Sequence, residues 1–267
     1  MMRAMWTAGS GMMAQQFNVD VISNNLSNVN TTSYKKQKVE FKDLLYETIQ
    51  RAYFFEQTGR PTNLQVGHGA VPVATTRSFE MGSLEKTDEK LNFAIDGEAF
   101  FMVRGPREEI VYTRDGSFRL AMTEDGKMIS TADGYPVLDE FGSEIFLDDI
   151  DLAAINVSED GEITYTDEDG TSIPLGYRIG LVKFDNREGL ENVGRNFYAM
   201  TSASGYHIPD TLVGRPSLLR QGYLESSNVQ VVEEMVKLIA AQRAYELSSK
   251  AVQTSDEMIG LANNLKR

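Results

Sequence analysis

The chain has 267 residues, of which 41% are hydrophobic and 24% are charged, values typical of a soluble globular protein. It contains no cysteine, which excludes disulfides and thiolate metal sites, and its net charge of −13 argues against nucleic acid or an anionic membrane as a partner. No apolar run approaches about 18 residues, so no membrane-spanning helix is predicted. The acidic excess lies between residues 46 and 227, and both ends are nearly neutral.

The first 30 residues have the periodicity of a helix. Alternating steps of four and three residues from Met1 reach an apolar side chain at every position except Gln15, which predicts a coiled-coil-like helix over 1–30. The first 14 residues carry a single basic side chain and run directly into polar residues, so a cleaved secretion signal is not expected. The apolar positions are Met1, Met5, Ala8, Met12, Val19, Ile22, Leu26 and Val29.

Residues 31–70 are predicted to form an extended connector. The segment begins with the basic cluster Lys35, Lys36 and Lys38 and has little regular pattern, and it is too long to be a plain loop. Aromatic side chains exposed on such a segment indicate a surface that meets another chain. The candidate contact residues are Tyr46, Tyr53, Phe54 and Phe55.

The middle of the chain, 71–227, is predicted to be an all-β domain of short antiparallel strands. All seven prolines lie between Pro61 and Pro216, and Asp-Gly, a strong hairpin dipeptide, occurs six times between Asp96 and Gly170. The runs between these turns are rich in β-branched and aromatic residues. The clearest predicted strands are 100–103, 110–113, 163–166 and 179–184.

Residues 228–267 are predicted to form a second long helix. From Ala240, alternating steps of four and three residues reach Ala244, Leu247, Ala251, Thr254, Met258, Leu261 and Leu265. A second apolar stripe, formed by Val231, Met235, Leu238 and Tyr245, covers the start of the segment.

A long helix with more than one apolar stripe needs partners on several sides. We therefore expect both terminal helices to be loose in the isolated subunit and to become ordered by packing on neighbouring copies. In the alternative, an intramolecular helical hairpin, the second stripe of the C-terminal helix stays exposed.

Three sequence motifs resemble the signatures of the flagellar rod and hook family. Ile22 to Thr32 (ISNNLSNVNTT) resembles its N-terminal signature, and SNV at 227–229, EEM at 233–235 and AQRAYE at 241–246 resemble its C-terminal one. Tyr112 to Phe118 (YTRDGSF) is similar to the family's β-domain motif. The resemblance covers essentially the whole chain.

Within the family, the chain is most similar to distal-rod members, because of its opening residues 2–16 and because it retains a stretch over about 46–67 that hook proteins lack. The paralogous proximal-rod subunit remains an alternative. Ser33 stands where the family usually has glycine, which makes a positive φ costly there, and Ala99 replaces the second glycine of a Gly-x-Gly-Phe-Phe motif.

The rival chemical motifs are weak. His68 and His207 lack the spacing of a metal site, and the loop starting at Asp167 resembles an EF-hand but has Arg178 at position 12, which favours a solvated hairpin tip. Asp148, Asp149 and Asp151 could act as glycosidase carboxylates, but adjacent acidic residues in a turn are commonly just exposed. An enzyme or an oligomeric binding module with its site in the acidic β-domain is the less favoured alternative.

The resemblance implies a structural, non-enzymatic subunit without cofactor or metal, which polymerises into the distal rod and transmits torque from motor to hook. It also implies partners: copies of the chain in a helical tube, the proximal-rod and hook proteins axially, and the flagellar export apparatus. The location implied is the basal body, outside the cytoplasmic membrane, after export without a cleavable signal. The predicted polymer interface comprises Met5, Ala8, Met12, Val19, Ile22, Leu26, Val29, Met235, Leu238, Ala244, Tyr245, Leu247, Ala251, Met258, Leu261 and Leu265.

Overall fold

The computed structural model describes residues 2–50, 63–123, 126–147, 154–167, 171–212 and 216–264. The chain divides into two compact units. The first contains Met1–Ser27, Gln37–Arg77 and Gln230–Arg267, and the second contains Asn28–Lys36 and Ser78–Val229. The fold is mixed α and β, with a helix at each end and antiparallel strands between them, as the sequence predicts.

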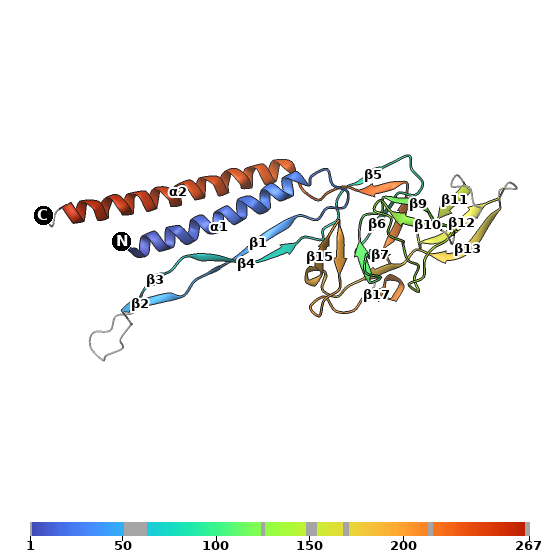
Figure 1. The fold of residues 1–267 in the computed structure, drawn as a ribbon, viewed down its shortest axis with the longest axis horizontal. Coiled ribbons are helices and arrows are strands. Elements are labelled where there is room, and N and C mark those ends of the chain that lie inside the picture. The colour runs from blue at the N-terminus through green and yellow to red at the C-terminus, as the bar shows by residue number, and fades with distance from the viewer. Residues whose placement is uncertain are drawn as a thin grey trace. The chain divides into compact units, whose positions relative to one another are not determined.

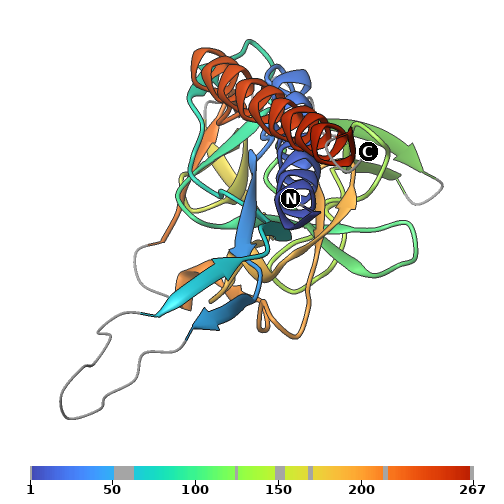
Figure 2. The ribbon, with the colours of Figure 1, turned by 90° about the vertical axis from the view of Figure 1, so that its left-hand side faces the viewer.

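Two long helices, α1 (Met2–Ser27) and α2 (Val231–Asn264), lie side by side in the first unit (Figures 1 and 2). Glu233 and Glu234 in the first turn of α2 complement the positive end of the helix dipole. Helix α1 stops at Ser27, and Asn28 then begins a turn in which its backbone and side-chain oxygens accept hydrogen bonds from Thr31. Val29, predicted to continue the apolar seam of this helix, therefore lies outside it, in a turn.

A long antiparallel ribbon completes the first unit. Strand β1 (Gln37–Asp43) pairs with β4 (Ala70–Arg77), and β2 (Tyr46–Gln50) pairs with β3 (Leu64–Gly67). The backbone bond from Leu44 N–H to Gly69 O links the two pairs. Gly69 has φ +110, and a Cβ there would lie 2.0 Å from the Ser10 hydroxyl of α1, so the ribbon approaches the helix closely at a position that only glycine fits. Regular paired strands thus occupy much of the range predicted as a connector.

The second unit is built from short antiparallel strands. Its largest sheet has the order β15-β16-β8-β7-β14-β17, and β11, β12 and β13 form a three-stranded sheet. Three strand pairs, β9 with β10, β6 with β18 and β5 with β19, complete it. The strands are β5 (Leu84–Lys86), β6 (Phe93–Asp96), β7 (Phe100–Arg104), β8 (Ile110–Thr113), β9 (Phe118–Thr123), β10 (Gly126–Thr131), β11 (Ile155–Val157), β12 (Glu162–Thr166), β13 (Ser172–Arg178), β14 (Leu181–Lys183), β15 (Glu191–Gly194), β16 (Phe197–Ala199), β17 (Ile208–Pro209), β18 (Leu218–Gln221) and β19 (Tyr223–Glu225).

The described sheets enclose two large apolar clusters and a smaller one formed by Val103, Val111 and Phe197. Phe101 and Phe118 pack edge to face at 5.0 Å in one large cluster, and Tyr112 and Phe184 pack in the same way at 4.8 Å in the other. The four clearest predicted strands are present as β7, β8, β12 and β14. Several fully buried residues of these clusters come from β6 and β7, whose side chains do not alternate between polar and apolar, which is typical of strands covered on both faces.

The Asp-Gly dipeptides do not all form hairpins. Asp160-Gly161 connects the paired strands β11 and β12, as predicted, with Gly161 at φ +83. Asp96-Gly97 and Asp115-Gly116 instead join strands that pair in different places, so the hairpin prediction is wrong there. At Gly116 a Cβ would lie 1.9 Å from the Phe93 carbonyl oxygen, so this glycine is required for close backbone approach.

Candidate assembly surface

The face of α2 that packs on α1 carries mainly small and polar side chains. Glu234, Ala241 and Ser255 are the buried residues of the described part of α2. A Cβ added to Gly11 of α1 would lie 3.4 Å from the Ser248 hydroxyl oxygen of α2, so the two helices come close at these small residues. Leu238, Val252 and Ile259 are the larger apolar residues of α2 that are partly buried, and the other large apolar side chains of the described part of α2 are exposed.

The predicted apolar seam of α1 is only partly covered within the first unit. Ile22 is buried, and Met5, Ala8, Met12, Val19 and Leu26 are partly buried. The buried residues of α1 are Ala14, Val21, Ile22 and Asn25, of which only Ile22 belongs to the predicted seam. Another face of α1 is exposed and carries Met2, Trp6, Met13 and Phe17.

The predicted apolar stripe of α2 does not face α1. Leu247 and Leu261 are 67% and 64% exposed, and Met258 is 44% exposed. Ala251 is also exposed, Ala244 is partly buried, and Leu265 lies outside the described residues. The helix uses a different face for its intrachain contact, and this stripe is left to solvent.

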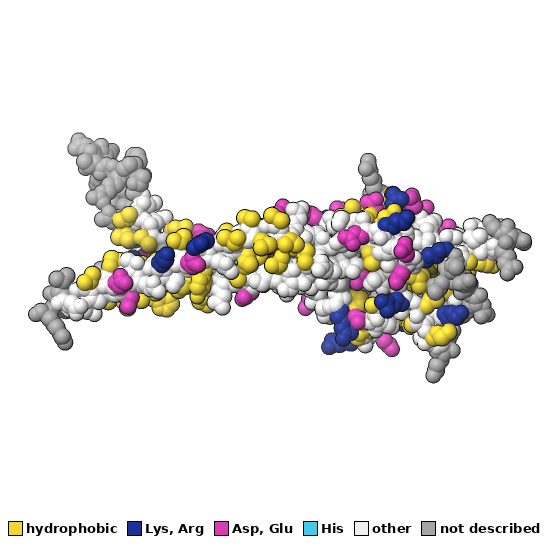
Figure 3. Space-filling view, turned by 90° about the horizontal axis from the view of Figure 1, so that it is seen from above, with side chains coloured by type: hydrophobic (Ala, Val, Ile, Leu, Met, Phe, Trp, Pro, Cys, Tyr) yellow, Lys and Arg dark blue, Asp and Glu magenta, His cyan; other side chains and the backbone are white. Residues whose placement is uncertain are grey.

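Further apolar side chains lie exposed near the start of α2. From the second predicted stripe, Met235 and Tyr245 are exposed and Leu238 is partly buried. Figure 3 shows hydrophobic side chains gathered along the helical unit on the face that carries α2. The exposed residues in this region also include Val231, Val232, Val236 and Ile239.

A groove of about 390 Å³ lies between α1 and α2. Its lining comes from both helices: Gln16 and Val19 of α1, and Gln242, Tyr245 and Glu246 of α2. Val19 and Tyr245 give it an apolar part, and the remaining residues are polar.

The β2–β3 part of the ribbon is also rich in exposed apolar side chains. Leu45 is 87% exposed, and Tyr46 and Ile49 are exposed beside it. Tyr46 pairs with Gly67 across the ribbon, and its ring covers the position where a Gly67 side chain would stand. Tyr53, Phe54 and Phe55, the other predicted contact residues, lie outside the described residues.

Asn25 links three segments of the first unit. Its carboxamide exchanges two hydrogen bonds of 2.9 Å with the backbone N–H and carbonyl of Gln37, as a neighbouring β-strand would do. It also donates to Glu234 of α2 at 3.2 Å, and Glu234 binds Lys237 at 2.6 Å. Asn25 therefore fixes the end of α1 against the beginnings of β1 and α2.

The second unit contains a fully buried ion cluster. The Glu225 carboxylate accepts hydrogen bonds from Arg114 Nε at 2.9 Å, from Lys35 Nζ at 2.5 Å and from Gly82 N–H at 2.9 Å. Arg114 also donates to the carbonyls of Gly97 and Ala99, and Lys35 to that of Glu80. The side chains of Lys35, Glu225 and Arg114 are at most 1% exposed, so each charge depends on these partners.

The electrostatics of the cluster follow from its burial. Burial and the neighbouring Arg114 charge lower the pKa of Lys35 to about 8, although Glu225 opposes this. Burial alone would raise the pKa of Glu225, but the charges of Arg114 and Lys35 and the hydrogen bonds it accepts hold that pKa below its usual value. Glu225 is therefore an anion at neutral pH, held between two cations.

Asn228 forms a second junction in the same unit. Its side-chain oxygen accepts from Lys36 N–H at 2.8 Å, and its NH₂ donates to Ser78 O at 2.9 Å and to Glu80 O at 3.1 Å. Asn228 and the ion cluster thus connect three chain segments to one another. These segments, 33–36, 78–82 and 225–228, are far apart in sequence.

The structure accommodates Ser33 and Ala99, two residues that differ from the family pattern. Ser33 does adopt a positive φ, +56, and its hydroxyl donates to the Arg114 carbonyl at 2.8 Å. The buried hydrogen bond offsets part of the cost of the left-handed backbone. Ala99 is fully buried and is not among the described residues with positive φ.

Three family models match segments of this chain. A flagella basal body rod protein model matches 5–35, a flagellar hook protein FlgE/F/G D1 domain model matches 94–165, and a flagellar basal body rod FlgEFG protein C-terminal model matches 220–265. The flagellar basal-body rod protein FlgG of Borreliella burgdorferi is 46% identical over 100% of both chains. The flagellar basal-body rod protein FlgG of Bacillus subtilis is 34% identical over 100% of both chains, and its flagellar hook-basal body complex protein FlhP is 31% identical, again over 100% of both.

The chain belongs to the flagellar basal-body rod family. It is a structural subunit of the rod, and the family is one of structural proteins rather than enzymes. Each of the three family-matched segments of this rod subunit supplies one residue of the ion cluster: Lys35, Arg114 and Glu225.

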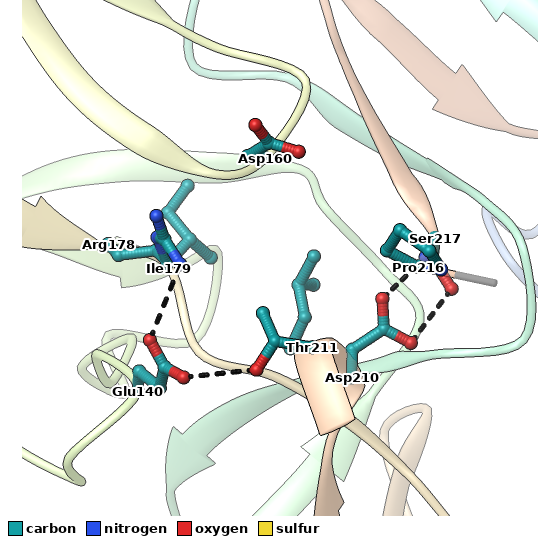
Figure 4. Close-up of a pocket in the computed structure, with 9 residues that line it drawn as sticks. Glu140, Asp160, Arg178, Ile179, Asp210, Thr211, Pro216 and Ser217 are labelled. Carbon is teal, nitrogen blue, oxygen red and sulfur yellow. Dashed lines mark hydrogen bonds and ion pairs between the residues drawn. The ribbon is translucent and has the colours of Figure 1, made fainter. Parts of the chain in front are cut away.

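One pocket of the β-rich unit combines acidic and hydroxyl side chains without a histidine among its lining residues. Two carboxylates of this pocket, which measures about 210 Å³, make structural contacts: Glu140 binds Arg178 at 3.8 Å, and Asp210 accepts hydrogen bonds from Ser217 (Figure 4). Asp210 also pairs with Lys183 at 2.6 Å. Asp148, Asp149 and Asp151 lie outside the described residues.

The two histidines of the rod subunit have local partners. His207 Nδ1 lies 2.9 Å from the Tyr112 hydroxyl, and His68 Nδ1 lies 2.9 Å from the Leu45 carbonyl oxygen. Burial raises the pKa of Tyr112 to about 12. Within the described ranges, no group of three or more His, Asp or Glu side chains could hold a metal ion, and no helix is long and apolar enough to cross a membrane.

Sequence reasoning did not identify the ion cluster. In the sequence, Lys35 belongs to a basic cluster and Arg114 to the motif Tyr112 to Phe118, and no pattern distinguishes Glu225. The available clue was Arg114 itself, since a charged residue inside a run of strand-forming residues requires a buried counter-ion. The sequence does not show which of its 39 acidic residues supplies that ion.

Proposed function

We propose that this rod subunit polymerises with copies of itself into the distal rod, a helical tube that transmits torque from the motor to the hook. The main support is the exposed apolar surface of α2, whose predicted stripe is left uncovered by its own chain. Apolar side chains at that density along a helix favour burial against another chain. The names of the full-length relatives support the rod, and the distal position rests on the resemblance noted above.

In this proposal the terminal segments 1–30 and 228–267 form the helical core of the tube, as a coiled-coil-like assembly, with the β-domain of 71–227 outside it. The predicted interface residues on α1 and α2 supply the contacts between copies. The 31–70 connector, with Tyr46, Tyr53, Phe54 and Phe55, wedges against axial neighbours and stiffens the tube. The proximal-rod and hook proteins are the proposed axial partners.

We also propose that the flagellar export apparatus delivers the subunit in an unfolded state to a site outside the cytoplasmic membrane. The terminal helices would then become ordered as they pack on the growing end. A helix with apolar side chains on its outer surface gains much of its stability from that packing.

Complementation of a strain that lacks this gene tests the function. The wild-type chain should restore hook-basal bodies and swimming, and Leu247→Asp should not, because a charge would be buried between copies. Met122→Asp, at an 82% exposed apolar position in the β-rich unit, is the matched control and should swim normally. A deletion strain that swims would reject the rod assignment, and a basal body with the tagged subunit next to the motor would reject the distal position.

A further inference from the structure

Helix α2 carries two different surfaces on opposite sides of its contact with α1. Buried Ala241 marks the side that faces α1. At roughly 100° per residue, Leu247, Ala251 and Met258 lie about a quarter turn or more to one side, and Gln242 and Glu246 lie similarly far to the other. The first set is the exposed apolar stripe, and the second lines the groove between the helices.

The groove can receive side chains of the kind that the stripe presents. It has about 390 Å³ of space, an apolar part formed by Val19 and Tyr245, and polar residues around it. The stripe presents leucine, methionine and alanine side chains along the same helix. A protruding apolar row and a partly apolar groove therefore occur in one unit, on opposite sides of one helix.

This arrangement favours a head-to-tail contact between copies. When a projection and its receptor lie on opposite sides of one molecule, each copy can engage two others, and the contact continues into a ring or a helical tube. The exposed stripe side chains offer on the order of 300 Å², well below the roughly 800 Å² per partner of a stable interface. A pair of copies in solution would thus be weak, and the contact would form when a subunit also touches other neighbours.

We propose that the α2 stripe of one copy, comprising Leu247, Ala251, Met258 and Leu261, packs into the α1–α2 groove of the next copy. This inference rests on the proposed polymer and specifies its lateral contact: stripe into groove, not stripe against stripe.

Cysteine cross-linking in assembled rods tests the contact, since the chain has no cysteine of its own. The double variant Ala251→Cys with Gln242→Cys carries one thiol on the stripe and one at the groove. The two thiols cannot bond within one helix, because a disulfide requires Cα atoms within about 7 Å and side chains that point toward each other. Companion variants place the stripe thiol at Thr254 or Met258 and the groove thiol at Gln16, which covers different axial offsets between copies.

Cells whose variants still swim would be oxidised and their basal bodies separated under non-reducing conditions. At least one stripe–groove combination should convert most monomer into a ladder of multimers, because each copy bonds to two others. The single-cysteine variants should stay monomeric. Dimers from Ala251→Cys alone would show stripe-to-stripe packing and overturn the proposal.

Failure of the contact is distinguishable from failure of the function. If all stripe–groove combinations swim and build rods but none cross-links, the stripe-into-groove contact is wrong and the polymer stands. If the wild-type chain is absent from purified basal bodies, the polymer itself is wrong. If every double variant is non-motile, the single variants Leu247→Lys and Val19→Asp are compared with their combination. Restored swimming in the combination supports the contact, and persistent loss overturns it.

Discussion

Glu225 is the residue on which the buried ion cluster depends. It is the common partner of Lys35 and Arg114, and the three side chains are at most 1% exposed. Glu225→Gln keeps the shape but leaves two buried cations without an anion, so we expect a loss of about 3–5 kcal/mol in the free energy of unfolding of the β-rich unit. Denaturant unfolding of the full chain measures this loss.

The matched control is Glu159→Gln. Glu159 pairs with Arg220 at 2.6 Å, but its side chain is 59% exposed. An exposed pair contributes about 0–1 kcal/mol, so this variant should unfold almost as the wild type does. Equal stability losses in the two variants would contradict the role assigned to burial.

The stability difference between wild type and Glu225→Gln should depend on pH. The pKa of Glu225 is lower in the folded chain than its usual value of 4.5, so its ionised form contributes stability that is fully present above about pH 4.5. That contribution is lost as the pH falls through the folded-state pKa, because the protonated carboxyl then resembles the amide. Unfolding curves from pH 7 to pH 3 should show the two proteins converging. A constant difference would place the effect elsewhere.

Ser33 adopts a backbone conformation that favours glycine, and a hydrogen bond from its hydroxyl offsets part of the cost. Ser33→Ala keeps the strained φ of +56 and loses the bond to the buried Arg114 carbonyl, so we expect a loss of about 1–3 kcal/mol in unfolding free energy. Ser33→Gly loses the same bond but relieves roughly 1 kcal/mol of backbone strain. Ranking the two variants by thermal or denaturant unfolding checks this, and glycine should be the more stable of the pair.

At the scale of elements, only Ile22 of the predicted α1 seam is among the buried residues of that helix. The periodicity of the sequence predicted both helices. It did not predict the inward face of α2. The buried residues of that face are Glu234, Ala241 and Ser255, and its larger apolar residues, Leu238, Val252 and Ile259, are only partly buried, so its hydrophobic pattern is weak. The apolar repeat of α2 reports the surface that faces outward in the single chain. An apolar stripe thus indicates that a helix needs apolar contacts on that face. It does not indicate whether the same chain or another copy supplies them.

The local sequence also predicted several strands of the β-domain, but it did not predict how these strands pair. Asp-Gly correctly marked the β11–β12 hairpin, but the same dipeptide at 96 and 115 joins strands that pair in different places. A dipeptide fixes the local backbone, whereas the partner of a strand depends on residues far away. The Lys35–Glu225 pair, separated by 190 residues, is the same kind of long-range contact.

The tight α1–α2 contact yields a prediction about α2. Ala241 is 3% exposed, so Ala241→Leu would overpack the helix pair, at an expected cost of about 1–3 kcal/mol in its stability. Ala251→Leu makes the same change at an exposed position of the same helix and should alter stability by less than about 0.5 kcal/mol. Amide exchange of α2 in the two full-length variants, labelled in millisecond pulses that resolve fast-exchanging amides, provides the comparison, and Ala241→Leu should exchange faster. Similar exchange in both would show that the buried face assigned to α2 is wrong.

For the whole molecule, the two units differ in how they bury apolar residues. The second unit encloses two large clusters of fully buried aromatic and branched side chains. In the first unit, the buried apolar residues of the helices are Ala14, Val21, Ile22 and Ala241, and large apolar side chains remain exposed on both helices. Because stability follows buried apolar area, the helices should open far more readily than the β-rich unit in an isolated subunit.

Hydrogen exchange of the dilute, full-length subunit tests this difference directly. Amides of α1 and α2 should exchange fast, and those of β7, β8 and β14 slowly. Limited proteolysis should remove both helices and leave a resistant core that retains Asn28–Lys36 and Ser78–Val229. In rods, the same helical amides should become protected, since neighbouring copies then cover the α2 stripe. The control is Met122→Asp, which should leave both patterns unchanged. Helices that are already strongly protected in the dilute subunit would show that the chain supplies its own stabilising contacts, and ordering on assembly would then have to be abandoned.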